Sequence, residues 1–478
     1  MNILKHTKAE HNDHTDYILS SCHYASFGLT KMFNESYLLH KDSTILPYDS
    51  KIKKLIIYLP EDPLILLKTI RQTAILLDDK YMNTSILFIC SCPLGWLWET
   101  LKSQFNSFIP LQNIRVTSSY SSINKIKKYA ENSGFELCPT LYSLVQLDTL
   151  VRCKAPVGLK RNEIDSIILS LKGISINEQK SILDIDRKSL YKSNLQGVNK
   201  LKCSYPFLAE RFPGVKKVRS ICYDAVEDNF DKKFIDAVFS MEIKDYYQPI
   251  FDGDGVLHGA EILCRWHLDE EVILPSKFLP KLKSSFALLV LTSFMIQQAV
   301  YRINECTDAL YFSVNIPVCL ANDKYLLNIL NEACKRLINE NDKKRLILEF
   351  PEDLCISNDS YVIENIKKIK NNGYKIYLDD CFSDSSVIFP RKIPLLDGFK
   401  LDMSIVSSFC SNDHETALIK SIVYFCKITN CVTIAEGVDS VEKYNTLKLL
   451  GIDLFQGYLF SKPVSFDTFK KLFNNMSI

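Results

Sequence analysis

Residues 374–380 read YKIYLDD, a short apolar run that ends in two adjacent aspartates, Asp379 and Asp380. Six more strand-like runs in the second half of the chain also end in an acidic, amide or lysine residue. These runs end at Glu261, Asn315, Glu349, Lys400, Glu436 and Gln456. Helix-like stretches separate most of them, and alternating strands and helices favour a parallel sheet, which enough repeats close into a barrel. Because the active sites of such barrels lie where the strands end, we expect these side chains to converge at one mouth.

The converging groups are five carboxylates together with amide groups and a lysine. Mg²⁺ and Mn²⁺ prefer carboxylate and amide oxygens and need no cysteine ligand. Any one of these residues alone would be read as a solvated or salt-bridged group at a strand end. The repeated pattern instead predicts a divalent-cation site.

Length and composition are those of an ordinary globular protein. The chain has 478 residues, room for two to four domains, a formal charge of +2 and 47% hydrophobic residues. No uninterrupted apolar run has the length of a membrane span, and the polar N-terminus does not read as a secretory signal. The sixteen cysteines are scattered singly apart from Cys90 and Cys92, which indicates reduced thiols. Neither this pair nor the N-terminal histidines have a structural zinc spacing. We therefore expect a cytoplasmic protein without a membrane segment.

Three segments differ in composition and in hydrophobic pattern. Residues 1–150 mix strand-like and helical runs, which predicts a small α/β domain. Residues 152–204 read as helical and basic, with eleven Lys and Arg against five acidic residues, a local charge of +6. A basic block in an otherwise slightly acidic chain indicates a polyanion partner. Residues 228–478 form the expected barrel.

The C-terminal segment resembles the EAL family over about 250 residues. The motifs YYQPIF, GAEILCRW, FSVN, LEFPEDL, YLDD, FKLD, IAEGVD and FQGYLFSKP occur in the family's order and spacing. This resemblance implies a modified TIM barrel with an antiparallel first strand. It also implies a phosphodiesterase that hydrolyses cyclic di-GMP to linear pGpG.

The resemblance assigns roles residue by residue. It implies two Mg²⁺ or Mn²⁺ ions held by Glu261, Asn315, Glu349, Asp379 and Asp380. Glu436 would lie next to the metals, Lys400 would orient or polarise the attacking water, and Gln456 would complete the water network. Gln248 and Arg265 would contact the substrate. Arg265 would bind a phosphate of the substrate, because a guanidinium can donate two parallel hydrogen bonds to it. Glu352 would brace the loop that follows Asp380.

Two departures from the family pattern bear on activity. The signature triplet has Ile262 where alanine is usual, which keeps the carboxylate of Glu261. The loop after Asp380 reads Cys381-Phe382-Ser383-Asp384-Ser385-Ser386 and lacks the family's two glycines. Glycines reach φ > 0 without strain, so we expect this loop to follow a different path. The second metal and the turnover rate therefore stay open, and a cyclic di-GMP sensor with weak or no turnover is the alternative.

The middle segment resembles the helix-turn-helix of LuxR-type regulators over residues 159–201. Gly173-Ile174-Ser175 precede one short helix, and Asp186 opens a second, which would enter the major groove of DNA. The candidate DNA contacts are Arg187, Lys188, Lys192 and Lys200. A helical connector with a solvated basic face is the other interpretation. Specific binding would need two copies, and EAL barrels commonly dimerise, so we expect a homodimer that regulates transcription.

The first 150 residues resemble a receiver domain that has lost its phosphorylation chemistry. The first strand runs into Ser20 and Ser21, and the third ends at Tyr58-Leu59-Pro60, where an aspartate would be required. An unrelated small α/β domain for dimerisation or sensing is the alternative. No motif indicates which signal this domain would sense or which operator DNA sequence the middle segment would bind.

Overall fold

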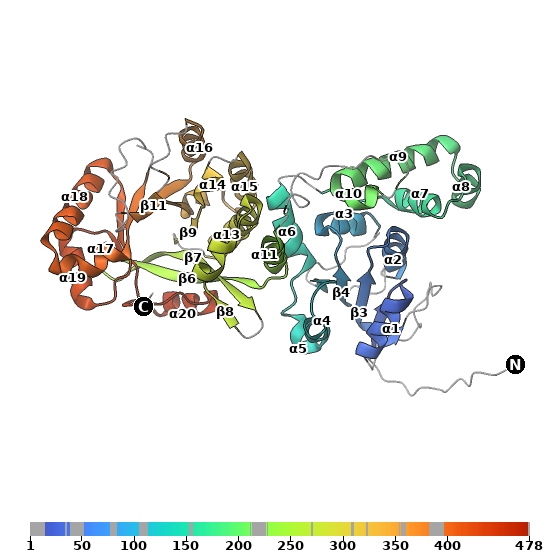
Figure 1. The fold of residues 1–478 in the computed structure, drawn as a ribbon, viewed down its shortest axis with the longest axis horizontal. Coiled ribbons are helices and arrows are strands. Elements are labelled where there is room, and N and C mark those ends of the chain that lie inside the picture. The colour runs from blue at the N-terminus through green and yellow to red at the C-terminus, as the bar shows by residue number, and fades with distance from the viewer. Residues whose placement is uncertain are drawn as a thin grey trace. The chain divides into compact units, whose positions relative to one another are not determined.

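The structure is a computed structural model. It describes residues 15–33, 36–38, 52–76, 84–104, 113–152, 156–210, 212, 226, 228–268, 271–306, 310–321, 324–352, 354, 360–381 and 396–476. The chain divides into two compact units, Met1–Ala225 and Val226–Ile478 (Figure 1). The N-terminal unit contains both the expected α/β domain and the expected helical domain.

A parallel sheet forms the centre of the N-terminal unit, with the strand order β2-β1-β3-β4-β5. The strands are β1 (Thr15–Leu19), β2 (Tyr37–Leu38), β3 (Ile52–Leu59), β4 (Ser85–Cys90) and β5 (Ile114–Ser118). The connecting helices are α1 (His23–Met32), α2 (Pro63–Leu76), α3 (Leu94–Gln104), α4 (Ile123–Ala130) and α5 (Asn132–Phe135). This order is that of flavodoxin-like doubly wound sheets. The prediction of an α/β domain at the N-terminus is therefore confirmed.

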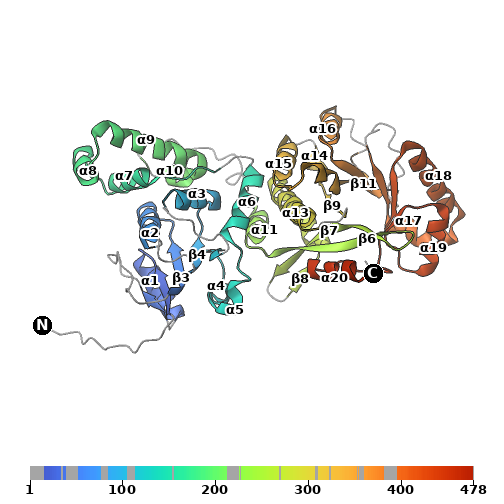
Figure 2. The ribbon, with the colours of Figure 1, turned by 180° about the vertical axis from the view of Figure 1, so that it is seen from behind.

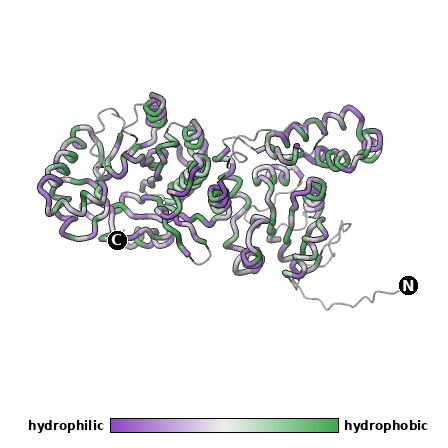
Figure 3. The backbone as a smooth tube through the Cα atoms, in the orientation of Figure 1, coloured by the Kyte–Doolittle hydropathy of each residue, from purple (hydrophilic) through white to green (hydrophobic). Residues whose placement is uncertain are grey.

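A helical group follows the sheet in the same unit. It consists of α6 (Leu141–Arg152), α7 (Arg161–Leu171), α8 (Ile176–Leu183), α9 (Arg187–Ser204) and α10 (Pro206–Ala209). Ser175 caps α8 in a reciprocal capping box with Glu178, and Asp186 caps α9. Asp184 ends α8 in the left-handed conformation (φ 50°), which produces the turn between the two helices. In Figure 3 most of α9 is coloured hydrophilic.

Polar and aromatic contacts attach this helical group to the sheet layer. The guanidinium of Arg71 on α2 lies 2.8 Å from the carboxylate of Asp165 on α7. The rings of Trp96 on α3 and Tyr205 after α9 have centroids 5.1 Å apart. Gln104 donates a hydrogen bond of 3.0 Å to the carbonyl of Leu159. The expected boundary near residue 151 is therefore crossed by several contacts, and both parts pack as one unit.

The C-terminal unit is a closed barrel of eight strands in the order β6-β14-β13-β12-β11-β10-β9-β7, with β7 pairing back to β6. Figures 1 and 2 show β6, β7, β9 and β11 of this barrel from two sides. The strands are β6 (Ile243–Asp252), β7 (Leu257–Leu268), β9 (Tyr311–Asn315), β10 (Leu346–Pro351), β11 (Lys375–Cys381), β12 (Gly398–Leu401), β13 (Val432–Ala435) and β14 (Leu454–Phe455). β6 is antiparallel to both of its neighbours, and the other barrel pairings are parallel. A short ninth strand, β8 (Glu271–Ile273), extends β7 as a hairpin. The prediction of a TIM-like barrel with an antiparallel first strand is confirmed.

Helices enclose the barrel. The longer ones are α11 (Asn229–Phe239), α13 (Ser285–Glu305), α15 (Lys324–Cys334), α16 (Ser360–Asn371), α18 (Asp413–Thr429), α19 (Val441–Leu450) and α20 (Phe466–Met476). Shorter turns are α12 (Pro275–Phe278), α14 (Val318–Ala321), α17 (Met403–Ser408) and the 3₁₀ segment η3 (Glu340–Arg345). Among the described residues α13 alone is long and apolar enough to cross a membrane, which the sequence reading did not single out. Its most apolar window is 78% buried, so α13 has the character of a core helix.

Two glycines make room for aromatic rings inside the barrel. A Cβ atom at Gly259 would lie 2.8 Å from the ring of Tyr311, and one at Gly398 would lie 2.8 Å from the ring of Tyr377. The two tyrosine rings meet edge to face, with centroids 6.2 Å apart. With Ile347 and other apolar residues they form a cluster that fills the lower part of the barrel. This apolar floor fixes the strands whose far ends carry the acidic residues.

Candidate metal centre

The strand ends bring the predicted polar residues together inside the barrel mouth. Glu261 lies on β7, Asn315 ends β9, Glu349 lies on β10, Asp379 on β11 and Lys400 on β12. Glu436 directly follows β13, and Gln456 directly follows β14. Strand register explains the convergence, because Glu349 is paired with Asn315 and Gln248 is opposite Glu261. Side chains two residues apart on a strand face the same side, so an inward-facing residue of each strand can contribute to this mouth.

The ammonium group of Lys400 is at the centre of the cluster. Its nitrogen lies 2.6 Å from Glu436, 2.8 Å from Asp379, 3.1 Å from Glu349 and 3.2 Å from Glu261. Lys400 is fully buried, and its four partners are buried or nearly so. Four carboxylates around one ammonium leave an excess of three negative charges if all ionise, and Asp380 beside Asp379 raises it to four. Such an excess is costly in a buried site unless cations or protons neutralise it.

Amide groups fix the orientation of Glu261. The Asn315 side chain donates to one oxygen of Glu261 at 2.7 Å, and the Gln456 side chain donates to the other at 2.7 Å. Burial by itself raises the pKa of Glu261. Lys400 and these two amides outweigh burial, so the pKa of Glu261 lies below its usual value. Glu261 is therefore held as a carboxylate.

The other acids of the cluster have raised pKa values. Burial, together with the neighbouring carboxylates, raises the pKa of Glu349 well above its usual value and raises that of Asp379. Burial raises the pKa of Glu436 to about 8 despite the contact with Lys400. Desolvation and the adjacent Asp379 raise the pKa of Asp380 to about 6. Protons therefore occupy part of this site at neutral pH unless cations replace them.

The donor set fits a divalent cation. Ligand atoms of Glu261, Glu349 and Asp379 lie within 4.8 Å of one another, as do those of Asp379, Asp380 and Glu436. Glu349 Oε1 and Gln456 Oε1 are buried and have no hydrogen-bond partner among the described residues. Buried oxygens of this kind require a partner, and carboxylate and amide oxygens suit Mg²⁺ or Mn²⁺. Two such ions would neutralise the excess charge of five carboxylates and one lysine.

Asp380 occupies a strained position at the end of β11. Its backbone has φ 50°, in the left-handed region. Aspartate tolerates this conformation better than most residues. The turn directs Asp380 and Asp379 to the same cluster although they are adjacent in sequence.

The remaining predicted residues lie outside the central contacts. Gln248 is on β6, opposite Glu261, and Arg265 is four residues beyond Glu261 on β7. The Arg265 guanidinium lies 5.6 Å from the centre of the Tyr246 ring. Glu352 is buried just after β10. The loop that it was predicted to brace, from Phe382 onward, lies outside the described residues.

Sequence reasoning missed two features of the site. Ser313 is fully buried on β9, two residues before Asn315 and therefore on the same inward face. Strict alternation along YFSVN could have identified it. The direct contact of Lys400 with four carboxylates was not predictable from spacing, because it depends on strand register across the barrel.

Comparison with known proteins agrees with this geometry. Residues 233–463 match the family model of the EAL domain. The C-terminal unit is an EAL domain. The probable cyclic di-GMP phosphodiesterase PdeG of Escherichia coli K12 is 25% identical over 48% of this chain and 46% of its own length. The cyclic di-GMP phosphodiesterase PdeL of the same organism is 26% identical over 48% of this chain and 64% of its own length.

The chain spans about half to two thirds of the length of these two curated relatives. Among solved structures, an EAL domain protein from Listeria monocytogenes EGD-e is 25% identical, with a TM-score of 0.46. That match covers 52% of this chain and 99% of the other. The residues that the family model matches lie in the unit that forms the barrel.

Proposed function

We propose that the EAL domain hydrolyses cyclic di-GMP to linear pGpG with Mg²⁺ or Mn²⁺. The observation that carries this proposal is the cluster of four carboxylates within 3.2 Å of the Lys400 ammonium at the mouth where the barrel strands end. Relatives that share the domain are described as cyclic di-GMP phosphodiesterases, which favours this substrate.

In this proposal Glu261, Asn315, Glu349, Asp379 and Asp380 hold two metal ions. When bound, such ions supply a nucleophile at neutral pH and stabilise charge on the reacting phosphate. The amides of Asn315 and Gln456 keep Glu261 deprotonated and correctly oriented. Glu436 and Lys400 share a short contact, so Glu436 can exchange a proton close to Lys400 while Lys400 orients the attacking water.

Substrate binding is assigned to Gln248 and Arg265. Both lie on the first two strands of the barrel, at the same end as the cluster. A guanidinium can bind a phosphate through two parallel hydrogen bonds, which suits Arg265. Glu352 is proposed to position the loop after Asp380.

The test is turnover of cyclic di-GMP by the full chain in Mn²⁺, with Glu261→Ala as the inactive variant. We expect conversion to pGpG that chelation abolishes, and no conversion by the variant. The exposed substitution Glu364→Ala, on α16, is the matched control and should retain full activity. Binding of the dinucleotide without any conversion would contradict the proposal and favour the alternative function, a cyclic di-GMP sensor.

We further propose that the helical group binds DNA through the N-terminal half of α9. Arg187, Lys188 and Lys192 are exposed there, and Asp186 fixes the start of the helix by accepting hydrogen bonds from the backbone of Lys188 and Ser189. Lys200 differs from these three, since its ammonium lies 2.8 Å from the buried carboxylate of Glu163 on α7. This contact favours a packing role for Lys200, and we leave it out of the proposed DNA surface.

A homodimer would present two copies of α9 to two half-sites, as helix-turn-helix regulators require. Selection of binding sites from random duplexes, followed by sedimentation of the complex, tests this part. Failure to enrich any sequence while the EAL domain turns over cyclic di-GMP would remove DNA binding and leave the enzyme proposal intact.

A further inference from the structure

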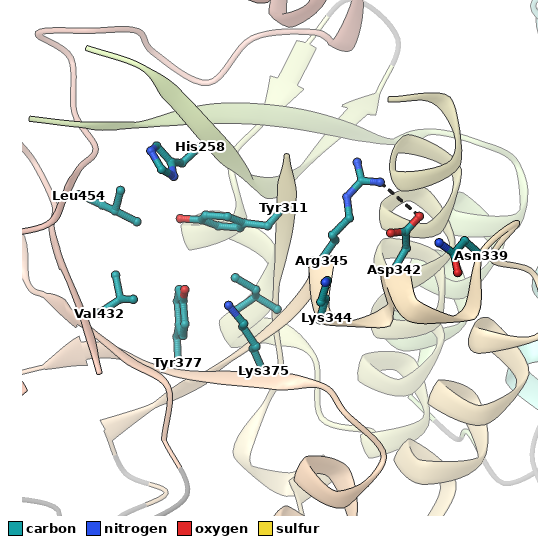
Figure 4. A pocket seen from close by; sticks show the side chains of 11 residues that line it. His258, Tyr311, Asn339, Asp342, Lys344, Arg345, Lys375, Tyr377, Val432 and Leu454 are labelled. Carbon is teal, nitrogen blue, oxygen red and sulfur yellow. Dashed lines mark ion pairs between the residues drawn. The ribbon is translucent and has the colours of Figure 1, made fainter. Parts of the chain in front are cut away.

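A cavity lies at the opposite mouth of the barrel, where the strands begin (Figure 4). His258 lies near the start of β7, and Tyr311, Lys375 and Val432 are the first residues of β9, β11 and β13. The acidic cluster lies at the other ends of these strands. The cavity volume is about 550 Å³. This size is within the range of small-molecule sites, about 300–1,000 Å³.

The rim of this cavity has an excess of positive charge. Lys344, Arg345 and Lys375 line it, against one carboxylate, Asp342. Arg345 is already engaged, because it donates to the carbonyls of Leu310 and Cys306 and lies 3.4 Å from Asp342.

Lys344 and Lys375 are the available cations. Both are exposed, and neither forms an ion pair with any residue that the structure describes. Strand register brings them to the same side, because Ile347, three residues after Lys344, is paired with Lys375. Figure 4 shows both lysines beside Arg345 at the same cavity. Two unpaired ammonium groups at one rim favour an anionic ligand.

The floor of the cavity is apolar and aromatic, with one polar group that lacks a partner. Tyr311, Tyr377, Val432 and Leu454 form this floor. The hydroxyl of Tyr311 is buried and has no hydrogen-bond partner among the described residues. A buried hydroxyl without a partner is unusual in a folded protein. Because this hydroxyl is shielded from solvent, the cavity offers its ligand an aromatic and apolar floor.

We propose that this cavity binds a phosphorylated small molecule of nucleotide size. Its phosphate lies on Lys344 and Lys375, and its apolar part lies against Tyr311 and Val432. The site is separate from the acidic cluster, and the proposal does not depend on hydrolysis of cyclic di-GMP. A ligand here would contact the start of the strands whose ends carry Asn315, Asp379 and Glu436.

The experiment is calorimetric titration of the full chain with AMP, adenosine and inorganic phosphate. EDTA is present throughout, so that no divalent cation can hold a nucleotide at the acidic cluster. We expect AMP to bind, and to bind at least tenfold more weakly to the variant Lys344→Ala/Lys375→Ala, a change of about 1.4 kcal/mol. The variant Lys367→Ala/Lys420→Ala removes two other exposed lysines, on α16 and α18, and should bind AMP like the parent.

Four outcomes would overturn the proposal. AMP does not bind at millimolar concentration, or it binds the two double variants equally. Adenosine binds as tightly as AMP, which would exclude phosphate recognition. Inorganic phosphate binds as tightly as AMP, which would exclude a role for the apolar floor. Both cavity lysines are exposed, so we expect each variant to fold. Circular dichroism of each variant checks that a loss of binding is not a loss of folding.

Discussion

The ammonium nitrogen of Lys400 lies 2.6 Å from a carboxylate oxygen of Glu436, where Lys400 is fully buried and the Glu436 side chain is 17% exposed. Charge-assisted contacts of this length are strong when they are shielded from solvent. The same ammonium also neutralises part of the negative charge of Glu261, Glu349 and Asp379. Lys400 is thus a structural counter-ion for the whole acidic cluster as well as the proposed partner of the attacking water.

Replacing Lys400 by methionine should destabilise the metal-free EAL domain. Removing one partner of a buried ion pair costs about 3–5 kcal/mol, because the remaining charge is left uncompensated. We expect a lower thermal transition in EDTA by scanning calorimetry, with a larger drop at pH 8 than at pH 5, where the carboxyls can protonate. Lys420→Met removes an exposed lysine on α18 and should leave the transition unchanged. An unaltered transition for Lys400→Met would mean that the cluster does not need this cation.

The stability of the metal-free protein should fall as pH rises through the titration range of Glu436. Its pKa is raised to about 8 in the folded state, so the folded state binds more protons than the unfolded state between about pH 4.5 and 8. Stability that this group contributes is therefore lost as pH increases across that window. We expect the transition temperature in EDTA to decrease from pH 5 to pH 8.

Glu436→Gln should reduce this pH dependence, since the amide does not titrate. Saturating Mn²⁺ should reduce it as well, because the cation replaces the protons of the site. If the parent and Glu436→Gln show the same slope of transition temperature against pH, Glu436 is not the titrating group.

Glu349→Gln should separate metal binding from folding. Burial and neighbouring carboxylates disfavour the charged form of Glu349. A neutral amide of the same shape should therefore raise the transition temperature of the metal-free protein at pH 8. The same change removes a proposed ligand and should weaken Mn²⁺ binding at least tenfold in a calorimetric titration. A variant that is less stable than the parent in EDTA but binds Mn²⁺ normally would assign Glu349 a purely structural role.

The exposed basic residues of α9 should control DNA affinity. Arg187→Ala/Lys188→Ala/Lys192→Ala removes three candidate phosphate contacts, and each contact contributes about 0.9 to the slope of log affinity against log salt. We expect weaker DNA binding and a slope smaller by roughly 2 to 3. Lys200→Ala should instead lower the stability of the N-terminal unit, because it leaves the Glu163 carboxylate buried without its partner. Equal salt slopes for the parent and the triple variant would exclude this face of α9.

The apolar floor of the barrel should be sensitive to a single methyl group at Gly398. A Cβ atom there would lie 2.8 Å from the ring of Tyr377 and 3.1 Å from the carbonyl oxygen of Val432. Overpacking of this kind typically costs about 1–3 kcal/mol. Gly253→Ala is the control, because its Cβ would meet only the flexible Lys448 side chain at 3.2 Å. Equal transition temperatures for the two variants would show that the floor can relax.

The sequence by itself determined the barrel and the membership of its polar mouth. Alternating apolar runs and helical stretches specify strands and helices locally, and polar residues near the ends of these runs, such as Glu349 and Asp379, predicted one shared mouth. Glu261 lies inside the long strand β7 (Leu257–Leu268), although the sequence placed it at the end of a run. The packing of α7 on α2 could not be predicted from the sequence, because it depends on a contact between segments that are far apart along the chain. Only the tertiary structure decided that Lys400 contacts four carboxylates and that a basic cavity lies at the other mouth. Both follow from strand register around a closed barrel, which sets distances between side chains on different strands, such as Lys400 and Glu349.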